Sequence, residues 1–196
     1  MCKISILTLT AVASAAASTA VSNVVWDESI KGSFSSDGFA PTQLGVFSLG
    51  ANRVLGTLDV MPDITPDYFS FEIAAGQQLA AIILERYAPA SGEQQQSFIA
   101  LQAGPQVTSE FDTSVFLGAT LVGGLPESLE GEDILDDLAT PLFGGQGFLP
   151  PLGPGIYSIW FQETAEAVGY TLAFVVVPAP TSALALVSLG LWRRRR

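Results

Sequence analysis

Three aspartates spaced four residues apart are the first side chains in this sequence that could carry out chemistry, here as ligands for a metal ion. Asp59, Asp63 and Asp67 surround the dipeptides Met61-Pro62 and Thr65-Pro66. Carboxylate oxygens on a rigid loop are ligands that calcium accepts. The spacing is not that of an EF-hand loop, however, and prolines also form turns that hold no ion. We therefore expect either a calcium site or an ion-free turn at these aspartates, and no other metal or cofactor.

A second acidic cluster lies further along the chain. Its members are Glu130, Glu132, Asp133, Asp136 and Asp137. Two carboxylates at a suitable separation can hydrolyse a glycosidic bond, but acidic residues are also favoured at the start of a helix by the helix dipole. Because the sequence fixes no separation between them, a solvated helix start and a carboxylate-dependent glycan hydrolase both stay open.

The residue types that many enzymes use are missing. The chain contains no histidine, and its one cysteine, Cys2, lies in the N-terminal segment. This excludes Ser-His-Asp and Cys-His catalysis, zinc sites built on these residues, and a disulfide within the chain. We therefore expect no catalytic residues and predict that the protein is not an enzyme. Trp26 and Trp160 are candidates for stacking on sugars, with packing in the core as the alternative.

Charge is sparse and strongly acidic. The 196-residue chain has a formal net charge of −11. Without Lys3 and the four C-terminal arginines, three basic residues stand against 19 acidic ones, a formal charge of −16. Such a surface repels phosphate backbones, so we expect no nucleic-acid partner. It also favours solubility and can collect divalent cations.

Short strands with period-two alternation recur along the body and would have to position any site. The expected strands, with the side chains that face one way, are residues 67–73 (Phe69, Phe71, Ile73), 79–87, 97–103, 155–161 (Tyr157, Ile159, Phe161) and 170–176 (Tyr170, Leu172, Phe174, Val176). Residues 79–87 are more continuously apolar, which favours a central position, and Val168-Gly169 is expected to form a turn. The pattern predicts an all-β, two-layer sandwich.

Residues 105–154 depart from this pattern and are richer in glycine, proline and acidic residues. Within them, Ile134, Leu135 and Leu138 recur at helical spacing behind acidic residues that suit a helix start. We expect one short helix, over residues 132–138, in a long loop between strands, and loops of this size are often functional. A disordered acidic loop is the alternative.

The first twenty residues have the composition of an export signal. Met1-Cys2-Lys3 is short and basic, residues 4–12 are mostly apolar, and residues 13–20 are mostly small. This order predicts a secretory signal peptide over residues 1–20, cut by signal peptidase after Ala17 or Ala20. A buried N-terminal helix is the alternative.

At the other end, an apolar segment precedes four arginines. As a helix, residues 181–192 would span about 18 Å, short of the ~30 Å hydrocarbon layer. Arg193, Arg194, Arg195 and Arg196 favour retention on the cytoplasmic side, and their side chains can reach the interface. Together with the export signal, they predict one topology, with the body outside the cytoplasm and the arginines inside.

This tail resembles the PEP-CTERM sorting signal of exopolysaccharide-producing bacteria, which combines a proline motif, an apolar helix and a terminal basic cluster. The motif here is Val177-Pro178-Ala179-Pro180, with alanine where the usual motif has glutamate. The resemblance implies that residues 178–196 are a sorting signal that is held transiently in the inner membrane. It also implies that an exosortase cuts near the motif and releases the protein outward. A plain C-terminal membrane anchor is the alternative.

The body resembles bacterial pre-peptidase C-terminal domains. The resemblance lies in residues 67–79, Asp-Tyr-Phe-Ser-Phe-Glu-Ile-Ala-Ala-Gly-Gln-Gln-Leu, in residues 155–161 and 169–174, and in the opening residues 26–37. It implies a jelly-roll-like antiparallel β-sandwich over residues 21–177, interrupted by the loop at 105–154, that binds or positions rather than catalyses.

Taken together, these features predict an exported, non-enzymatic protein of the cell surface or extracellular matrix, associated with exopolysaccharide and biofilm. It would be a structural or adhesive component. The alternatives are the glycan hydrolase and a surface protein that is simply anchored by its C-terminus.

Overall fold

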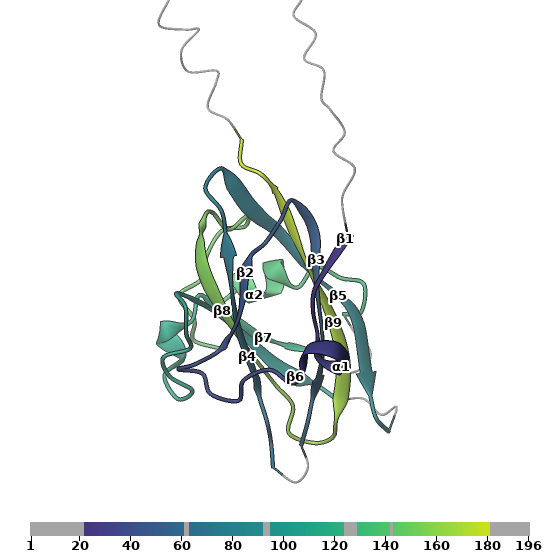
Figure 1. Ribbon diagram of the computed structural model, residues 1–196. Coiled ribbons are helices and arrows are strands. Elements are labelled where there is room, and N and C mark those ends of the chain that lie inside the picture. The colour runs from purple at the N-terminus through teal and green to yellow at the C-terminus, as the bar shows by residue number, and fades with distance from the viewer. Residues whose placement is uncertain (1–21, 61–62, 92–94, 124–128, 142, 181–196) are drawn as a thin grey trace, which may run out of the picture.

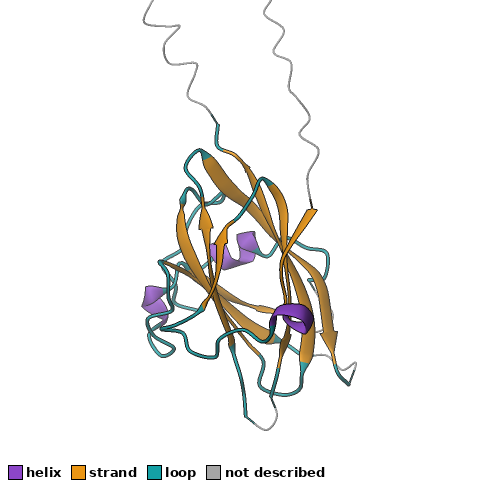
Figure 2. Ribbon diagram, in the orientation of Figure 1, coloured by secondary structure: helices purple, strands orange, loops and turns teal. Residues whose placement is uncertain are grey.

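The computed structural model describes residues 22–60, 63–91, 95–123, 129–141 and 143–180 (Figure 1). The expected signal peptide and the tail beyond Pro180 lie outside these residues. Strands dominate the described chain, and the helices are short (Figure 2). In chain order the elements are β1 (Ser22–Asp27), α1 (Glu28–Lys31), β2 (Thr42–Val46), β3 (Gly50–Leu58), β4 (Asp67–Ile73), β5 (Gln77–Pro89), β6 (Ser97–Ala103), η1 (Thr113–Val115), β7 (Gly118–Val122), α2 (Leu135–Ala139), β8 (Gly155–Gln162) and β9 (Val168–Pro178).

The strands form two sheets. Sheet A has the order β1-β3-β9-β5, and sheet B has the order β2-β4-β8-β6-β7. The expectation of a purely antiparallel sandwich is wrong, because β1 pairs with β3, and β2 with β4, in parallel. From β1 to β5, successive strands belong alternately to sheet A and sheet B. The chain crosses to the other sheet and comes back between β1 and β3, and again between β2 and β4, so the two strands of each pair run in the same direction. Both sheets are therefore mixed, with one parallel pair at an edge of each.

The inward rows predicted from the alternation meet between the sheets. Phe71 of β4 lies 4.9 Å from Phe174 of β9, measured between ring centroids, and stacks at 4.7 Å on Phe47. These rings and the neighbouring aliphatic side chains are almost fully buried in one core. Each large side chain buried in this way contributes about 1.5–3 kcal/mol. The described residues thus form an all-β sandwich whose sheets pack face to face.

The central position expected for residues 79–87 is wrong, because β5 is the last strand of sheet A. Its outer edge is covered by the long loop. Leu79 and Leu152 exchange backbone hydrogen bonds of 2.8 and 3.0 Å, and the Ile134 N–H donates to the Ile82 carbonyl at 2.8 Å. This cover shields the edge from water and from other strands. It allows an edge strand to carry the apolar sequence that is typical of a central one.

The long loop is folded wherever it is described; residues 124–128 and 142 lie outside the described chain. The expected helix is present as α2, and Ile134, Leu135 and Leu138 are fully buried in the main core. The loop also contains β7 and η1, which the sequence pattern did not predict. β7 pairs with β6 and extends sheet B. Gly118 lets α2 approach β7, because a Cβ at this position would lie 1.5 Å from the Leu138 carbonyl oxygen.

Both ends of the described chain leave the sandwich at the same end (Figure 1). Ser22 of β1 pairs with Ala51, whose neighbour Gly50 pairs with Val176 of β9. The last strand begins at Val168, where a turn was expected, and ends at Pro178. None of the helices in the described ranges is both long and apolar enough to cross a membrane.

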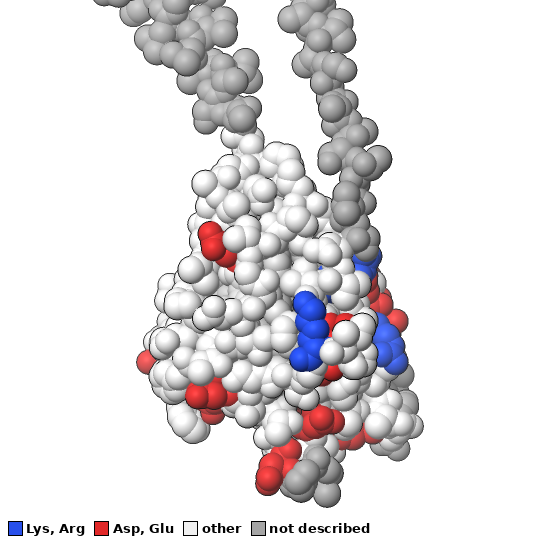
Figure 3. Space-filling view, viewed as in Figure 1, with Lys and Arg blue, Asp and Glu red and all other residues white. Residues whose placement is uncertain are grey.

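Charge is distributed unevenly over the sandwich. The basic residues within the described ranges are Lys31 on α1, Arg53 on β3 and Arg86 on β5, so they belong to sheet A and to the helix beside it. On the face seen in Figure 3, the basic side chains lie near α1 and β1, and the acidic ones lie mostly in the lower half of the view. The strands of sheet B contain no lysine or arginine.

Candidate functional site

The outer face of sheet B carries a second, smaller core. Trp160 points away from the main core and is 9% exposed. Its ring lies 4.8 Å from that of Phe98, 5.9 Å from Phe116 and 6.0 Å from Tyr68. Val107 and Phe116, from the first part of the long loop, are buried in this cluster. The packing alternative for Trp160 is therefore confirmed, although one part of its surface faces a cavity.

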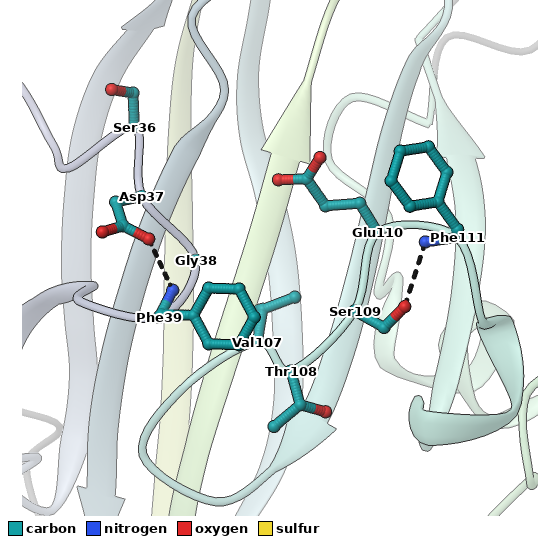
Figure 4. A pocket seen from close by; sticks show the side chains of 9 residues that line it. All are labelled: Ser36, Asp37, Gly38, Phe39, Val107, Thr108, Ser109, Glu110 and Phe111. Atoms are coloured by element: carbon teal, nitrogen blue, oxygen red, sulfur yellow. Dashed lines mark hydrogen bonds between the residues drawn. The ribbon is translucent and has the colours of Figure 1, made fainter.

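Two adjoining cavities lie on this face, and we call them together the outer groove. The first has a volume of about 440 Å³ and is lined by residues 36–39 and 107–111 (Figure 4). The second has about 360 Å³. Its lining is made of Gln96, Phe98, Glu110, Thr113, Leu121, Trp160, Gln162 and Thr164. Because Glu110 lines both cavities, the two are neighbours along one groove.

The first wall of the groove is the segment between α1 and β2. Asp37 Oδ1 accepts a hydrogen bond from the Phe39 N–H at 2.9 Å, which fixes a tight turn around Gly38 (Figure 4). The Gly38 carbonyl accepts from the Val107 N–H at 2.9 Å and so ties this wall to the opposite one. A Cβ at residue 38 would lie 3.2 Å from both Tyr68 and Val107, so glycine permits the close approach. The Phe39 side chain is left 65% exposed.

The opposite wall carries Glu110 and Phe111. Figure 4 shows the Glu110 side chain reaching across the cavity toward the segment that holds Asp37. Glu110 Oε1 accepts the hydrogen bond of the Tyr68 hydroxyl at 2.5 Å, and Tyr68 is fully buried. Burial, then the bond to Glu110, raises the pKa of Tyr68, so the phenol stays a neutral donor that orients the carboxylate. Phe111 is 97% exposed.

The three aspartates considered for calcium have different environments. The Asp63 side chain is exposed, while Asp67 is buried and accepts a hydrogen bond from the Tyr170 hydroxyl at 2.7 Å. Burial, followed by the charge of Glu28, raises the pKa of Asp67 to about 8, and Asp59 adds a smaller effect. The Asp59 carbonyl accepts from the Thr65 N–H at 2.9 Å. Across the described ranges, no three acidic side chains are arranged to hold a metal ion.

The second acidic cluster joins the long loop to β5. Asp133 Oδ1 accepts hydrogen bonds from the Ile82 N–H at 2.9 Å and from the Leu135 N–H at 3.0 Å. Glu130 Oε2 accepts from the Tyr87 N–H at 3.4 Å. Asp136 and Asp137 lie in the first turn of α2, and burial raises the pKa of Asp137. Asp133 and Glu130 thus tie the loop to β5, while Asp136 and Asp137 belong to the start of α2.

The remaining predicted residues lie away from the groove. Trp26 donates from Nε1 to the Gly32 carbonyl at 3.1 Å and packs 5.4 Å from the Phe34 ring, so it serves packing.

In the sorting motif, Val177 and Pro178 belong to β9, one residue past the expected domain boundary. The Ala179 N–H donates to the Gly76 carbonyl at 2.8 Å, and Pro180 is exposed. Arg193, Arg194, Arg195 and Arg196 lie outside the described residues.

Four residues of the groove were missed by sequence reasoning: Asp37, Phe39, Glu110 and Phe111. They lie in irregular segments, where no periodicity says which way a side chain points. The available signal is that both phenylalanines stand outside any alternating run and close to an acidic residue. Such rings have no strand or helix face that would bury them.

Known proteins offer no guide to this site. A comparison with protein-family models, with curated proteins and with solved structures found no match to the chain.

Proposed function

We propose that this protein is an exported, non-enzymatic component of the cell surface or extracellular matrix that holds a polysaccharide in the outer groove. The observation that carries the proposal is the lining of the groove, where Phe39 and Phe111 lie beside the carboxylates of Asp37 and Glu110. Aromatic rings offer flat apolar faces to sugar rings, and carboxylates accept hydrogen bonds from hydroxyls. Two adjoining cavities, rather than one closed pocket, suit an extended chain.

The proposed fold is the jelly-roll-like sandwich of the pre-peptidase C-terminal domains. Its support is the sequence resemblance, together with a strand-rich chain folded into two facing sheets. The absence of histidine from the chain agrees with a domain that binds or positions rather than catalyses.

The proposed route of export uses both ends of the chain. A signal peptide at residues 1–20 would start translocation, and the PEP-CTERM-like tail at residues 178–196 would pause it in the inner membrane until an exosortase releases the protein. This route suits the position of the groove. β4 and β8 run from the Tyr68–Trp160 pair beside the groove to the Ile73–Gly155 pair at the end where the tails leave. The groove would therefore face away from the membrane.

A binding measurement on residues 22–180 tests the proposal. Every core side chain buried among the described residues lies between Phe34 and Val176, so this fragment contains the whole described core. It also keeps Pro178 and the Ala179 hydrogen bond, which a fragment ending at Val177 would lose. We expect calorimetric titration with oligosaccharides of matrix polymers to show saturable binding.

Two variants and one control locate the binding. Phe39→Ala and Phe111→Ala should each weaken it by about tenfold, or ~1.4 kcal/mol. The control is Leu149→Ala, because Leu149 is 89% exposed but does not line the groove. Equal affinities in all three variants, or no binding to any oligosaccharide, would exclude the groove as the site. Release of reducing ends that is lost in Glu110→Gln would replace this proposal with the glycan hydrolase.

A further inference from the structure

Within the described part of the chain, no basic side chain lies near the carboxylates of the outer groove. Among the described residues, no lysine or arginine lines either cavity, and the strands of sheet B, beneath the groove, contain none. The basic residues within the described ranges are engaged or placed on other elements. Lys31 Nζ donates to the Val25 carbonyl at 2.6 Å, Arg53 pairs with Glu85 at 2.6 Å, and Arg86 lies on β5. The charge of the groove is therefore negative.

Both carboxylates are held in place by neighbouring donors. Asp37 Oδ1 accepts the Phe39 N–H, and Glu110 Oε1 accepts the Tyr68 hydroxyl. Each of these bonds uses one of the two oxygens of its carboxylate and comes from a neutral donor. The negative charge of each group is thus oriented but not neutralised, which favours a cationic ligand over an anionic one.

The aromatic lining points to the same class of ligand. Phe39 and Phe111 lie in the same cavity as the two carboxylates, and both rings are largely exposed. An ammonium group is attracted to the face of an aromatic ring as well as to a carboxylate. A uronic-acid or sulfated polymer would instead meet like charge on both sides of the first cavity.

We propose that the outer groove selects polymers of amino sugars that carry free amines, in preference to acetylated, neutral or acidic polysaccharides. This inference rests on the proposed function and names its ligand class. Protonated amines along the polymer would meet Asp37 and Glu110, while the sugar rings lie against Phe39 and Phe111.

The test compares oligosaccharides of equal length that differ in charge. Residues 22–180 are titrated with a glucosamine oligomer, its fully N-acetylated form and a uronic-acid oligomer, at about pH 6, where carboxylic acids are ordinarily ionised. We expect the glucosamine oligomer to bind about tenfold more tightly than the acetylated one at low salt, and this ratio to shrink as salt is added. The uronic-acid oligomer should bind least.

Two charge variants separate the groove from general attraction to an acidic protein. Glu110→Gln and Asp37→Asn should each reduce the preference for the amine by about threefold or more, since each removes one groove carboxylate. Glu132→Gln is the matched control: it removes the same charge from an exposed position beside β5. Circular dichroism checks that every variant is folded.

The outcomes distinguish this inference from the proposed function. If the acetylated oligomer binds as tightly as the amine, and Phe39→Ala weakens both, the groove binds glycans but the inference is overturned. The inference also fails if Glu132→Gln lowers the preference as much as Glu110→Gln does, because the attraction is then general. If no oligomer binds, the proposed function itself fails.

Discussion

Replacing Asp67 with asparagine should stabilise the sandwich at neutral pH and destabilise it in acid. Asp67 is 4% exposed, and its Oδ2 accepts the hydrogen bond of the Tyr170 hydroxyl at 2.7 Å. Burial, and then the charge of Glu28, raises the pKa of this carboxyl from 3.8 to about 8, although the Tyr170 hydrogen bond acts in the opposite direction. At pH 7 the native protein therefore keeps a proton on Asp67 that the unfolded chain releases.

The size of the effect follows from the linkage between protonation and folding. Below about pH 4 Asp67 is protonated in both states, and its full contribution to stability is present. Between about pH 4 and pH 8 only the native state holds the proton, so the free energy of unfolding falls by ~1.4 kcal/mol per pH unit, or ~4 kcal/mol by pH 7. Above about pH 8 both states are ionised and the loss is complete.

Asparagine removes this loss because it cannot ionise. Its carbonyl oxygen can still accept the Tyr170 hydrogen bond, whereas a buried amide N–H without a partner costs about 1–3 kcal/mol. We therefore expect Asp67→Asn to be more stable than the original protein by about 1–3 kcal/mol at pH 7, and less stable by a similar amount at pH 4.

Urea denaturation of residues 22–180 at several pH values between 4 and 9 measures this difference. Asp63→Asn is the matched control, because it makes the same substitution at an exposed position. Tyr170→Phe removes the hydrogen bond that lowers the pKa of Asp67, so its stability should keep falling to a higher pH than that of the original protein. A difference between Asp67→Asn and the original protein that stays constant from pH 4 to pH 8 would refute the reasoning, since it would mean that Asp67 is ionised in the native state.

Three further predictions concern the loop cover and the tail. Gly118→Ala should destabilise the fold by about 2 kcal/mol or more, because its Cβ would overlap the Leu138 carbonyl, whereas Gly153→Ala, with open space around it, should be neutral in the same urea measurement. Leu138→Ala should cost about 2–5 kcal/mol, and a cost near zero would mean that α2 is not docked. Neutral replacement of residues 193–196 should leave the tail poorly retained in the inner membrane and impair maturation, as cell fractionation and intact mass would show. Unchanged localisation and mass would remove the sorting proposal's main support.

The local sequence pattern was sufficient to predict the inward-facing side chains wherever one face of a strand packs on the core. Phe71, Ile159 and Phe174 were placed correctly because period-two alternation is the signature of a strand that is buried on one side. The helix α2 was also predictable, since Ile134 and Leu138 recur at the spacing of a helix that buries one face.

The order of the strands in each sheet, and which strands lie at its edges, could not be predicted, because they depend on contacts between segments that are far apart in the sequence. β5 has the apolar sequence of a central strand although it lies at an edge of sheet A. Its outer edge forms backbone hydrogen bonds with the loop at Ile134 and Leu152 instead of with a neighbouring strand. β7 is a five-residue strand that includes Gly118, so its strand character comes from pairing with β6 rather than from its own sequence. The parallel pairs of β1 and β2 likewise depend on the path between the sheets.

The outer groove is the part of sheet B that the long loop leaves open. Alternation along β8 turns Trp160 outward, but whether it faces water or protein depends on residues that lie about fifty positions earlier. There the loop buries Val107 and Phe116 over the tryptophan and, between them, exposes Phe111 beside Glu110. A loop that served only to cover Trp160 would have no need for an exposed ring next to an oriented carboxylate. This arrangement supports the proposal that the outer groove binds a ligand.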